Sequence, residues 1–399
     1  MSDKAAARMA EALTSRCVDV VTKPDLIARL SESRPLRVKL GIDPTGPQLH
    51  LGHAVALRKL RQFQDLGHQA VLIVGDFTAR IGDPSGRADA RRPRTPQEIA
   101  DDMKTYAEQA ALIIDMDRTE IRYNSEWLGK LDFGDVIELA AKTTVARTLE
   151  RDDFAQRYAA RESIGLHEFL YPIGMGYDSV AVKADVELGG TEQLFNLLMG
   201  RQLQEAHGQP PQICMTMPIL EGTDGVLRMG KSLNNFIALR EAPAQMFGKI
   251  MSLPDALLRR YWELATTADD KEIEQALARG PRDAKLLLAE AIVRFYHGGD
   301  AAREAREHFE KTVVRKEIPE DARIYPLTDD LRSATVLKLL VMTGLAGSNR
   351  EAQRLVEQGA IRVDGTRVDD PQHSERSWDG KILQRGNHQF VRIVMREAS

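Results

Sequence analysis

The chain has 399 residues, of which 43% are hydrophobic and 29% are charged, and its formal net charge is −4. This length suits two or three domains, and the balance is typical of globular proteins. Two cysteines, Cys17 and Cys214, exclude a disulfide framework, and no run of 18 apolar residues offers a membrane span. We therefore predict a cytoplasmic protein with no membrane partner and no global attraction to nucleic acid.

The first organised segment reads as strand, loop, helix and strand. Residues 36–43 (LRVKLGID) are a short apolar stretch, residues 53–68 carry apolar side chains at helical spacing, and residues 69–77 (QAVLIVGDF) form a continuous apolar run. Two buried strands joined by a crossover helix make a βαβ unit. The expected fold class is therefore α/β, with a Rossmann-like parallel sheet covered by helices on both faces.

The rest of the chain divides into further parts. Helical patterns dominate residues 95–180, further strands are expected at 183–193 and 211–220, and residues 241–312 are almost wholly helical. A charged, proline-bearing stretch, EIPEDARIYPLTDD at 317–330, is the linker candidate. We predict a Rossmann-like domain at 1–240, a helical domain at 241–316, a linker at 317–332, and a small α+β domain at 333–399.

Two histidines stand at the mouth of the first predicted crossover helix. His50 and His53 lie three apart around Gly52, after the carboxyl end of a buried strand, which is where open α/β sheets bind ligands. A helix N-terminus offers N–H groups and a positive dipole to an anion, and Gly52 lets a flat group approach the backbone. The alternative is that both histidines are polar residues at a solvated helix start.

Two later loops carry further basic residues. Residues 75–93 (GDFTARIGDPSGRADARRP) contain Arg87 and Arg91, and residues 224–236 (DGVLRMGKSLNNF) contain Arg228 and Lys231. Each alone also reads as a basic surface loop, and GKS without upstream glycines is no phosphate cradle. Together with the histidines they suit transfer at a phosphate through positioning and charge neutralisation, without a covalent nucleophile.

A third feature is a helix face with one carboxylate. Tyr171, Met175 and Asp178 stand at positions i, i+4 and i+7, on one side of a helix. A carboxylate on an otherwise apolar and aromatic face is costly unless it meets a partner. The residue is either a capping or salt-bridged aspartate, or it binds a hydroxyl of a substrate.

The sequence resembles a known family over nearly its whole length. GIDPTGPQLHLGH and RMGKS are similar to the HIGH and KMSKS signatures of class I aminoacyl-tRNA synthetases. LRQFQDLGH, IGDPSG, TVARTLERDDF, HEFLYPIGMGYDSV and ADVELGGTEQLFNLLMGR resemble the bacterial tyrosyl-tRNA synthetases. The tail is similar to an RNA-binding module shared with a small-subunit ribosomal protein. The resemblance implies a homodimeric tyrosine–tRNA ligase that uses ATP with Mg²⁺ and binds no metal tightly by itself.

The resemblance also assigns roles to residues. Those implied to contact the phosphates and act in catalysis are Thr45, His50, His53, Arg87, Arg91, Arg228 and Lys231. Those implied to bind ATP are Gly52, Gly190, Glu192, Met229 and again Lys231. Those implied to form the amino-acid pocket are Lys39, Asp43, Thr78, Asp83, Tyr171, Met175, Asp178 and Gln193, with Asp178 taking the phenolic hydroxyl of tyrosine.

Several positions depart from the family pattern. Met175 replaces a glutamine that binds the substrate ammonium, and a thioether cannot donate a hydrogen bond. Glu192 replaces an aspartate, Arg228 and Gly230 replace the first lysine and first serine of KMSKS, and Lys39 stands where one branch has a second tyrosine. These departures leave open a divergent second copy that activates a tyrosine analogue or confers resistance to an inhibitor.

The last domain carries a pair of arginines that bears on the choice between functions. Residues 333–399 hold 10 basic and 8 acidic residues. The stretch SNREAQRLVEQG, from residue 348, is expected to begin with a helix that exposes Arg350 and Arg354 on one face. Such a pair is commonly a solvated surface, but the resemblance implies contacts with the phosphates of tRNA(Tyr). A HIGH-type nucleotidyltransferase acting on a small acid or alcohol would not need this tail. An RNA-binding paralogue without activity would not need the histidines and Lys231.

Overall fold

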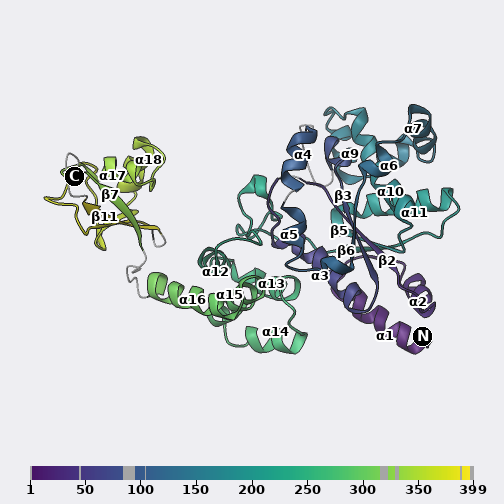
Figure 1. The fold of residues 1–399 in the computed structure, drawn as a ribbon, viewed down its shortest axis with the longest axis horizontal. Helices are drawn as coiled ribbons and strands as arrows, with labels where there is room; N and C mark the ends of the chain where they lie inside the picture. Colours follow the sequence, from purple (N-terminus) through teal and green to yellow (C-terminus); the bar gives the residue numbers. More distant parts are fainter. Residues whose placement is uncertain are drawn as a thin grey trace. The chain divides into compact units, whose positions relative to one another are not determined.

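The computed structural model describes residues 2–44, 46–83, 95–103, 105–314, 322–328, 332–386 and 389–395. The chain forms two compact units, one of residues 1–242 with 249–296 and one of residues 243–248 with 297–399. Each unit is built around its own sheet (Figure 1).

The described helices are α1 (Asp3–Thr14), α2 (Lys23–Ser31), α3 (Leu51–Asp65), α4 (Pro96–Met103), α5 (Tyr106–Ala110), α6 (Ser125–Leu128), α7 (Phe133–Ala140), α8 (Val145–Thr148), α9 (Asp152–Ala159), α10 (Leu170–Val182), α11 (Leu194–Ala206), α12 (Pro243–Met251), α13 (Leu258–Ala265), α14 (Asp270–Leu277), α15 (Pro281–His297), α16 (Gly299–Phe309), α17 (Val336–Met342) and α18 (Asn349–Glu357). The short 3-10 helices are η1 (Thr78–Arg80), η2 (Met116–Arg118), η3 (Leu166–Phe169), η4 (Thr191–Gln193), η5 (Lys231–Leu233) and η6 (Asp255–Leu257), and η7 (Glu310–Val314) is a π-helix.

The first unit contains a six-stranded sheet in the order β1-β6-β5-β2-β3-β4. Its strands are β1 (Val20–Val21), β2 (Arg37–Ile42), β3 (Gln69–Val74), β4 (Thr119–Tyr123), β5 (Val186–Gly190) and β6 (Ile213–Met217). All neighbours pair in parallel except β1 with β6. Helices flank the sheet on both sides, with α3 on one side and α11 on the other (Figure 1). The predicted Rossmann-like fold class is confirmed.

The strands predicted from apolar runs are those that are buried. β2, β3, β5 and β6 match the stretches expected at 36–43, 69–77, 183–193 and 211–220, and α3 matches the predicted crossover helix. β4 was not predicted, because its sequence TEIRY is only partly buried at the sheet edge and lies within a stretch of helical patterns. β1 was also missed, because two residues are too short for any periodic signal.

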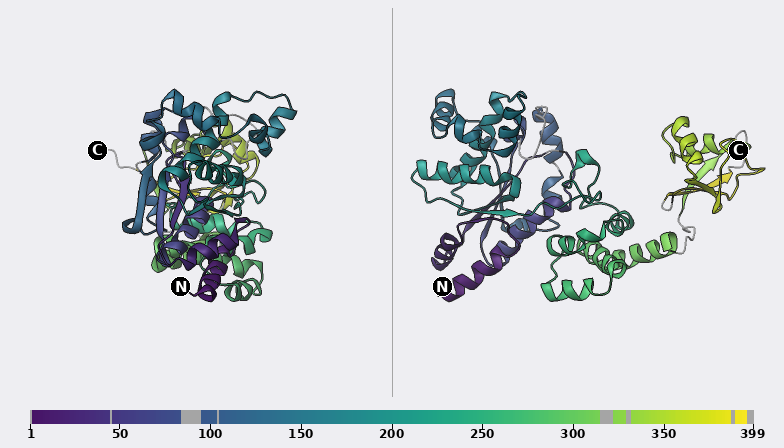
Figure 2. Two further views of the ribbon diagram at one scale, coloured as in Figure 1. Left: turned by 90° about the vertical axis from the view of Figure 1, so that its right-hand side faces the viewer. Right: turned by 180° about the vertical axis from the view of Figure 1, so that it is seen from behind.

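The second unit contains the sheet of the tail, in the order β7-β11-β10-β8-β9. Its strands are β7 (Arg323–Leu327), β8 (Ile361–Val363), β9 (Thr366–Arg367), β10 (Ile382–Arg385) and β11 (Gln389–Met395). Helices α17 and α18 belong to the same module (Figure 2, yellow-green), whose core contains the fully buried Trp378. The indole Nε1 donates to the Ala334 carbonyl at 2.9 Å.

The predicted linker needs a correction. Residues 323–327 form β7, which pairs in parallel with β11, and Leu327 is buried in the core of the tail module. The stretch looked like a linker because it is charged and contains Pro326. An edge strand tolerates both features, since one of its sides donates no ladder hydrogen bonds.

Candidate active site

One cavity of about 900 Å³ opens at the carboxyl ends of the parallel strands of the first unit. Backbone from the ends of β2, β3, β5 and β6 lines it, at Ile42, Gly75, Gly189 and Met217. α3, α10 and the loop after β6 complete its walls. This is the edge at which open α/β sheets bind ligands, so the topology brings the three predicted loops and the predicted helix face to one place.

The two histidines form one wall of the cavity. His50 is the N-cap residue of α3, and its ring centroid lies 3.9 Å from that of His53. Burial, followed by the nearby His53 and Lys231, holds the pKa of His50 well below its usual value. Burial and Lys231 lower the pKa of His53 to about 3. Both imidazoles are therefore neutral at physiological pH in this conformation and offer N–H groups rather than charge.

Space beside the first histidine is kept by a glycine. A Cβ on Gly52 would lie 3.0 Å from the ring of His50 and 3.6 Å from Met229. Among the residues that the structure describes, His50 Nδ1 is buried without a hydrogen-bond partner. A buried polar atom of this kind, at a helix N-terminus that faces a cavity, is suited to an anionic ligand.

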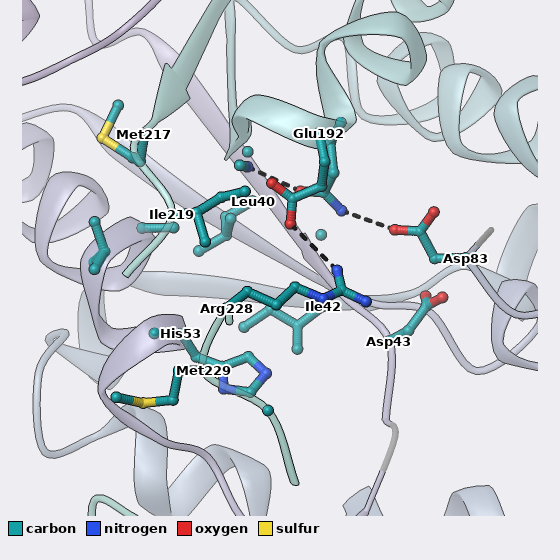
Figure 3. Close-up of a pocket in the computed structure, with 18 of the residues that line it drawn as sticks. Leu40, Ile42, Asp43, His53, Asp83, Glu192, Met217, Ile219, Arg228 and Met229 are labelled. Carbon is teal, nitrogen blue, oxygen red and sulfur yellow. Dashed lines mark hydrogen bonds and ion pairs between the residues drawn. The ribbon is translucent and has the colours of Figure 1, made fainter. Parts of the chain in front are cut away.

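The loop after β6 closes over the same end of the cavity. Lys231 Nζ donates to the Gly46 carbonyl at 3.0 Å, which places the ammonium next to the loop that follows β2. Arg228 Nη1 lies 3.8 Å from Glu192 Oε1, and Figure 3 shows the two side chains facing each other across the pocket. Burial raises the pKa of Glu192. The cations and this carboxyl group therefore surround one volume, which suits a nucleotide.

Asp43, Thr78 and Tyr171 form a hydrogen-bonded group in the wall of the cavity. Thr78 Oγ1 donates to Asp43 Oδ1 at 2.8 Å, and the Tyr171 hydroxyl donates to Asp43 Oδ2 at 3.0 Å. Nearby, Gln193 Nε2 donates to Asp83 Oδ2 at 3.2 Å, and its Oε1 accepts from the Gly190 N–H (Figure 3). These are the groups that the resemblance assigned to the amino-acid pocket.

Asp178 is the buried carboxylate of this region. The Trp127 indole donates to its Oδ1 at 2.8 Å, and Asn124 Nδ2 donates to its Oδ2 at 3.2 Å. Burial raises the pKa of Asp178 to about 6, although Lys39 and these two donors act in the opposite direction. These bonds fix the direction of both oxygens. Each oxygen has a second lone pair that can accept from one more donor, such as a phenol.

Met175 lies between these two groups on α10. It lines the cavity and packs with Tyr171, Leu197 and Cys214. The wall at this position is therefore apolar. A substrate ammonium would find its partners on the acidic side, at Asp43 and Asp83.

Comparison with known proteins identifies the family. The family model described as tRNA synthetases class I (W and Y) matches residues 31–314, and the S4 domain model matches residues 336–374. The chain belongs to the class I tRNA synthetases. The synthetase is 50% identical over 387 residues to the tyrosine–tRNA ligase of Thermotoga maritima, covering 96% of each chain. It is 50% identical to that of Moorella thermoacetica, covering 97% of this chain and 96% of the relative.

A solved structure supports the fold. The tyrosyl-tRNA synthetase of Archaeoglobus fulgidus, crystallised with L-tyrosine, has a TM-score of 0.62 and 22% identity, covering 76% of this chain and 100% of the other. The predicted resemblance to the bacterial tyrosyl-tRNA synthetases is thus confirmed at the level of family and fold. No helix in the described part of the synthetase is both long and apolar enough to cross a membrane.

Most of the site residues predicted from sequence lie around the cavity of the synthetase. Those that line it are Asp43, His50, Gly52, His53, Thr78, Asp83, Tyr171, Met175, Asp178, Gly190, Glu192, Gln193, Arg228, Met229 and Lys231. Thr45, Arg87 and Arg91 lie outside the described residues.

Lys39 requires a correction. It does not line the cavity; its side chain is completely buried beneath the pocket and forms an ion pair with Glu187. The prediction failed because a position in the middle of a strand fixes which face a side chain takes but not how far it reaches. The Lys39 side chain therefore contacts other groups of the protein, not the amino acid.

Sequence reasoning missed three residues that shape the site. Asn124 and Trp127, which hold Asp178, follow β4, so only the sheet topology could have placed them here. Asn235 holds the lysine loop: its Oδ1 accepts from the Gly230 N–H at 2.8 Å, and its Nδ2 donates to the Arg228 carbonyl at 3.1 Å. Its position inside the third basic loop was the one available signal.

The tail of the synthetase presents the predicted arginines. Arg350 and Arg354 are exposed on α18, whose opposite side buries Ala352, Leu355 and Val356. The Ser348 side chain caps this helix by accepting from the Glu351 N–H. The arginines therefore lie on a surface that the core of the module leaves available to a partner.

Proposed function

We propose that the chain activates tyrosine with ATP to form tyrosyl-adenylate and then transfers the tyrosyl group to the 3′ end of tRNA(Tyr). The observation that carries this proposal is Asp178, held by Trp127 and Asn124 in the wall of a cavity that two histidines and Lys231 also line. A phenol acceptor and a phosphate site in one pocket suit joining tyrosine to a nucleotide. The tyrosine–tRNA ligases cited above are similar over nearly their full length.

The proposed chemistry requires no nucleophile from the protein. The tyrosine carboxylate attacks the α-phosphorus of ATP, which enters with Mg²⁺, and pyrophosphate leaves. Arg228 and Lys231 neutralise charge that develops on the departing phosphates, and the neutral His50 and His53 donate N–H groups to the same oxygens. Glu192 and Gly190 hold the ribose, and Gly52 and Met229 border the nucleotide. Thr45, Arg87 and Arg91 are proposed to contact the phosphates, as the resemblance implies.

The second half of the reaction transfers the amino acid. A ribose hydroxyl at the 3′ end of tRNA attacks the carbonyl carbon of the adenylate, and AMP leaves. Asp43, Asp83, Tyr171 and Gln193 are proposed to hold the tyrosine ammonium and carboxyl in place during both steps. Positioning of this kind accounts for large parts of an enzymatic barrier.

Pyrophosphate exchange tests the proposal. Incubated with ATP, Mg²⁺, labelled pyrophosphate and one amino acid at a time, the protein should exchange label into ATP with tyrosine and far less with phenylalanine. Absence of exchange with tyrosine and with its analogues would refute the enzymatic assignment. A tail-less nucleotidyltransferase does not account for the family match at 336–374. An inactive RNA-binding paralogue would not need His50, His53 and Lys231, and exchange of label with tyrosine would exclude it.

Met175 supports a second candidate, a divergent synthetase that activates a tyrosine analogue. Hydrogen bonds to charged groups contribute roughly 1.5–3 kcal/mol, and Met175 offers none to an ammonium. If tyrosine is the substrate, Met175→Gln should lower the KM for tyrosine about ten- to a hundredfold and change the KM for ATP less. A higher tyrosine KM in this variant would favour a pocket repacked around another ligand, for which a flexible thioether supplies apolar contact.

The tail is proposed to bind tRNA through Arg350 and Arg354, with residues 241–316 on the anticodon side and 1–240 carrying out catalysis. Replacing both arginines with alanine should weaken tRNA binding roughly tenfold and lessen its salt dependence, because two phosphate contacts are lost. Adenylate formation should be unchanged. Arg367→Ala is the matched control, because that guanidinium already pairs with Asp369. Equal loss in both proteins would argue against this surface.

We also propose a homodimer. Large apolar side chains are exposed between residues 133 and 166, including Phe133 at 80% and Leu166 at 82%, together with Ile137, Val145 and Tyr158. Exposed apolar side chains in such number are typical of an interface. Sedimentation should show a dimer, and Phe133→Asp with Leu166→Asp should shift it to monomer; a wild-type monomer at micromolar concentration would exclude the assignment. We propose that the enzyme acts in the cytoplasm, as the resemblance to bacterial synthetases implies.

A further inference from the structure

A buried ion pair lies beneath the amino-acid end of the cavity. Lys39 of β2 and Glu187 of β5 face each other as register partners on neighbouring strands, and both side chains are 0% exposed. Lys39 Nζ lies 2.7 Å from Glu187 Oε1. Removing two charges from water is expensive, and an apolar pair of similar volume commonly gives equal or greater stability. The location of the pair therefore suggests a use other than stability.

The remaining donors of Lys39 bind the helix that carries the pocket. Its ammonium donates to the Met175 carbonyl and to Ser179 Oγ, each at 2.9 Å. Ser179 Oγ in turn donates to Glu187 Oε2 at 3.1 Å. The ammonium thus donates two hydrogen bonds to α10 while it forms the ion pair with Glu187. α10 is fastened at Met175 and Ser179, which lie on either side of Asp178 in the sequence.

The network is closed on the side of α11. A Cβ on Gly200 would lie 3.0 Å from Ser179 Oγ and 3.3 Å from Glu187 Oε2. Gln212 Nε2 fills the remaining space and donates to the same Glu187 oxygen. The ion pair therefore has a fixed geometry. Asp178 is a buried carboxylate on α10, the helix to which the Lys39 ammonium is bonded.

We propose that Lys39, paired with Glu187, is a positioning residue of the amino-acid site: it fixes the face of α10 that carries Asp178 and holds a positive charge under that helix. The inference rests on the proposed function, because it takes Asp178 as the acceptor of the tyrosine hydroxyl. Lys39 itself touches no substrate.

The two members of the pair act on Asp178 with opposite signs. Burial raises the pKa of Asp178 to about 6; Lys39 lowers it, Trp127 and Asn124 lower it through hydrogen bonds, and Glu187 raises it. Loss of Lys39 must therefore raise this pKa, so that the carboxylate is lost at a higher pH. Loss of the Glu187 charge must lower it. A purely structural role predicts no such reversal of sign.

The experiment compares tyrosine with phenylalanine in the full-length protein. The Kd for phenylalanine divided by the Kd for tyrosine isolates the hydroxyl contact. In the wild type this ratio should decline as the pH falls through about 6. In Lys39→Met the midpoint of this decline should move up by about one pH unit, which lowers the ratio about two- to fivefold at pH values between the two midpoints and close to tenfold below both. In Glu187→Gln the midpoint should move down.

Lys59→Met is the matched control. Lys59 is also buried, but its ammonium donates to the carbonyls of Leu13 and Ser15, away from the cavity. It should leave the midpoint unchanged. An unchanged midpoint in Lys39→Met, or shifts of the same sign in both pair variants, would overturn the inference while a wild-type preference for tyrosine upheld the proposed function. A wild type without that preference would overturn both. Glu187→Gln decides the question if Lys39→Met is not recovered folded.

Discussion

Asp178→Asn should lower the preference for tyrosine over phenylalanine, measured as the ratio of kcat/KM values, by roughly 10²–10³. Sites that bind a substrate hydroxyl reject the analogue without it by about 10⁵, and tyrosyl-tRNA synthetases are themselves the source of that figure. Asparagine would turn an amide N–H₂ group toward the Trp127 or the Asn124 donor, so the site would lose its charge and gain an opposed donor pair.

The control for this variant is Asp185→Asn. Asp185 is equally a buried aspartate, but it pairs with Arg29 and Arg34 at the amino end of β5, away from the cavity. Its replacement should reduce stability and affect both amino acids alike. A preference that survives in Asp178→Asn would mean that another group recognises the phenol.

The second large effect is expected at the phosphate end. His50→Ala or Lys231→Ala should slow formation of tyrosyl-adenylate by about 10²–10³, the size seen when one transition-state donor is removed. Tyrosine affinity should change much less, because neither residue belongs to the hydrogen-bonded groups around Asp43 and Asp178. Single-turnover measurements of adenylate formation, with tyrosine Kd measured separately, give both quantities.

His68→Ala is the matched histidine control. His68 is buried as well, but its Nδ1 accepts from the Leu36 N–H just before β2 begins. It therefore lies at the amino ends of the strands, whereas the cavity lies at their carboxyl ends. Its replacement should leave the rate of adenylate formation near the wild-type value. If His50→Ala and Lys231→Ala also retained that value, the loops would not be catalytic.

The sequence predicted those parts of the molecule that carry a periodic or local signal. Strands such as β3 and β5 are buried on both faces and therefore read as continuous apolar runs. β4 and β7 are edge strands that are only partly buried or largely exposed, so neither reads as an apolar run, and Pro326 further obscured β7. An edge strand is defined by its single neighbour, which is a property of the sheet rather than of the segment.

The same distinction applies to the site. The histidines, Lys231 and Asp178 were predicted because they lie in short motifs or on one helix face. Asn124 and Trp127 were not, because they reach Asp178 only through the pairing of β3 with β4. Lys39 was assigned to the pocket although its ammonium turns under α10, since the reach of a long side chain depends on partners from other elements.

The contact between α10 and α11 sets how this pocket can be redesigned. A Cβ on Gly176 would lie 3.1 Å from the Gly200 backbone nitrogen, so the two helices are already as close as backbones permit. With Lys39 bound to the carbonyl of Met175, the helix can neither approach nor withdraw without breaking buried hydrogen bonds. An engineer who wants a larger or differently charged amino acid must therefore change the side chains on a stationary wall. Met175, which makes no side-chain hydrogen bond that this wall depends on, is the position at which volume and polarity can be exchanged at the least structural cost.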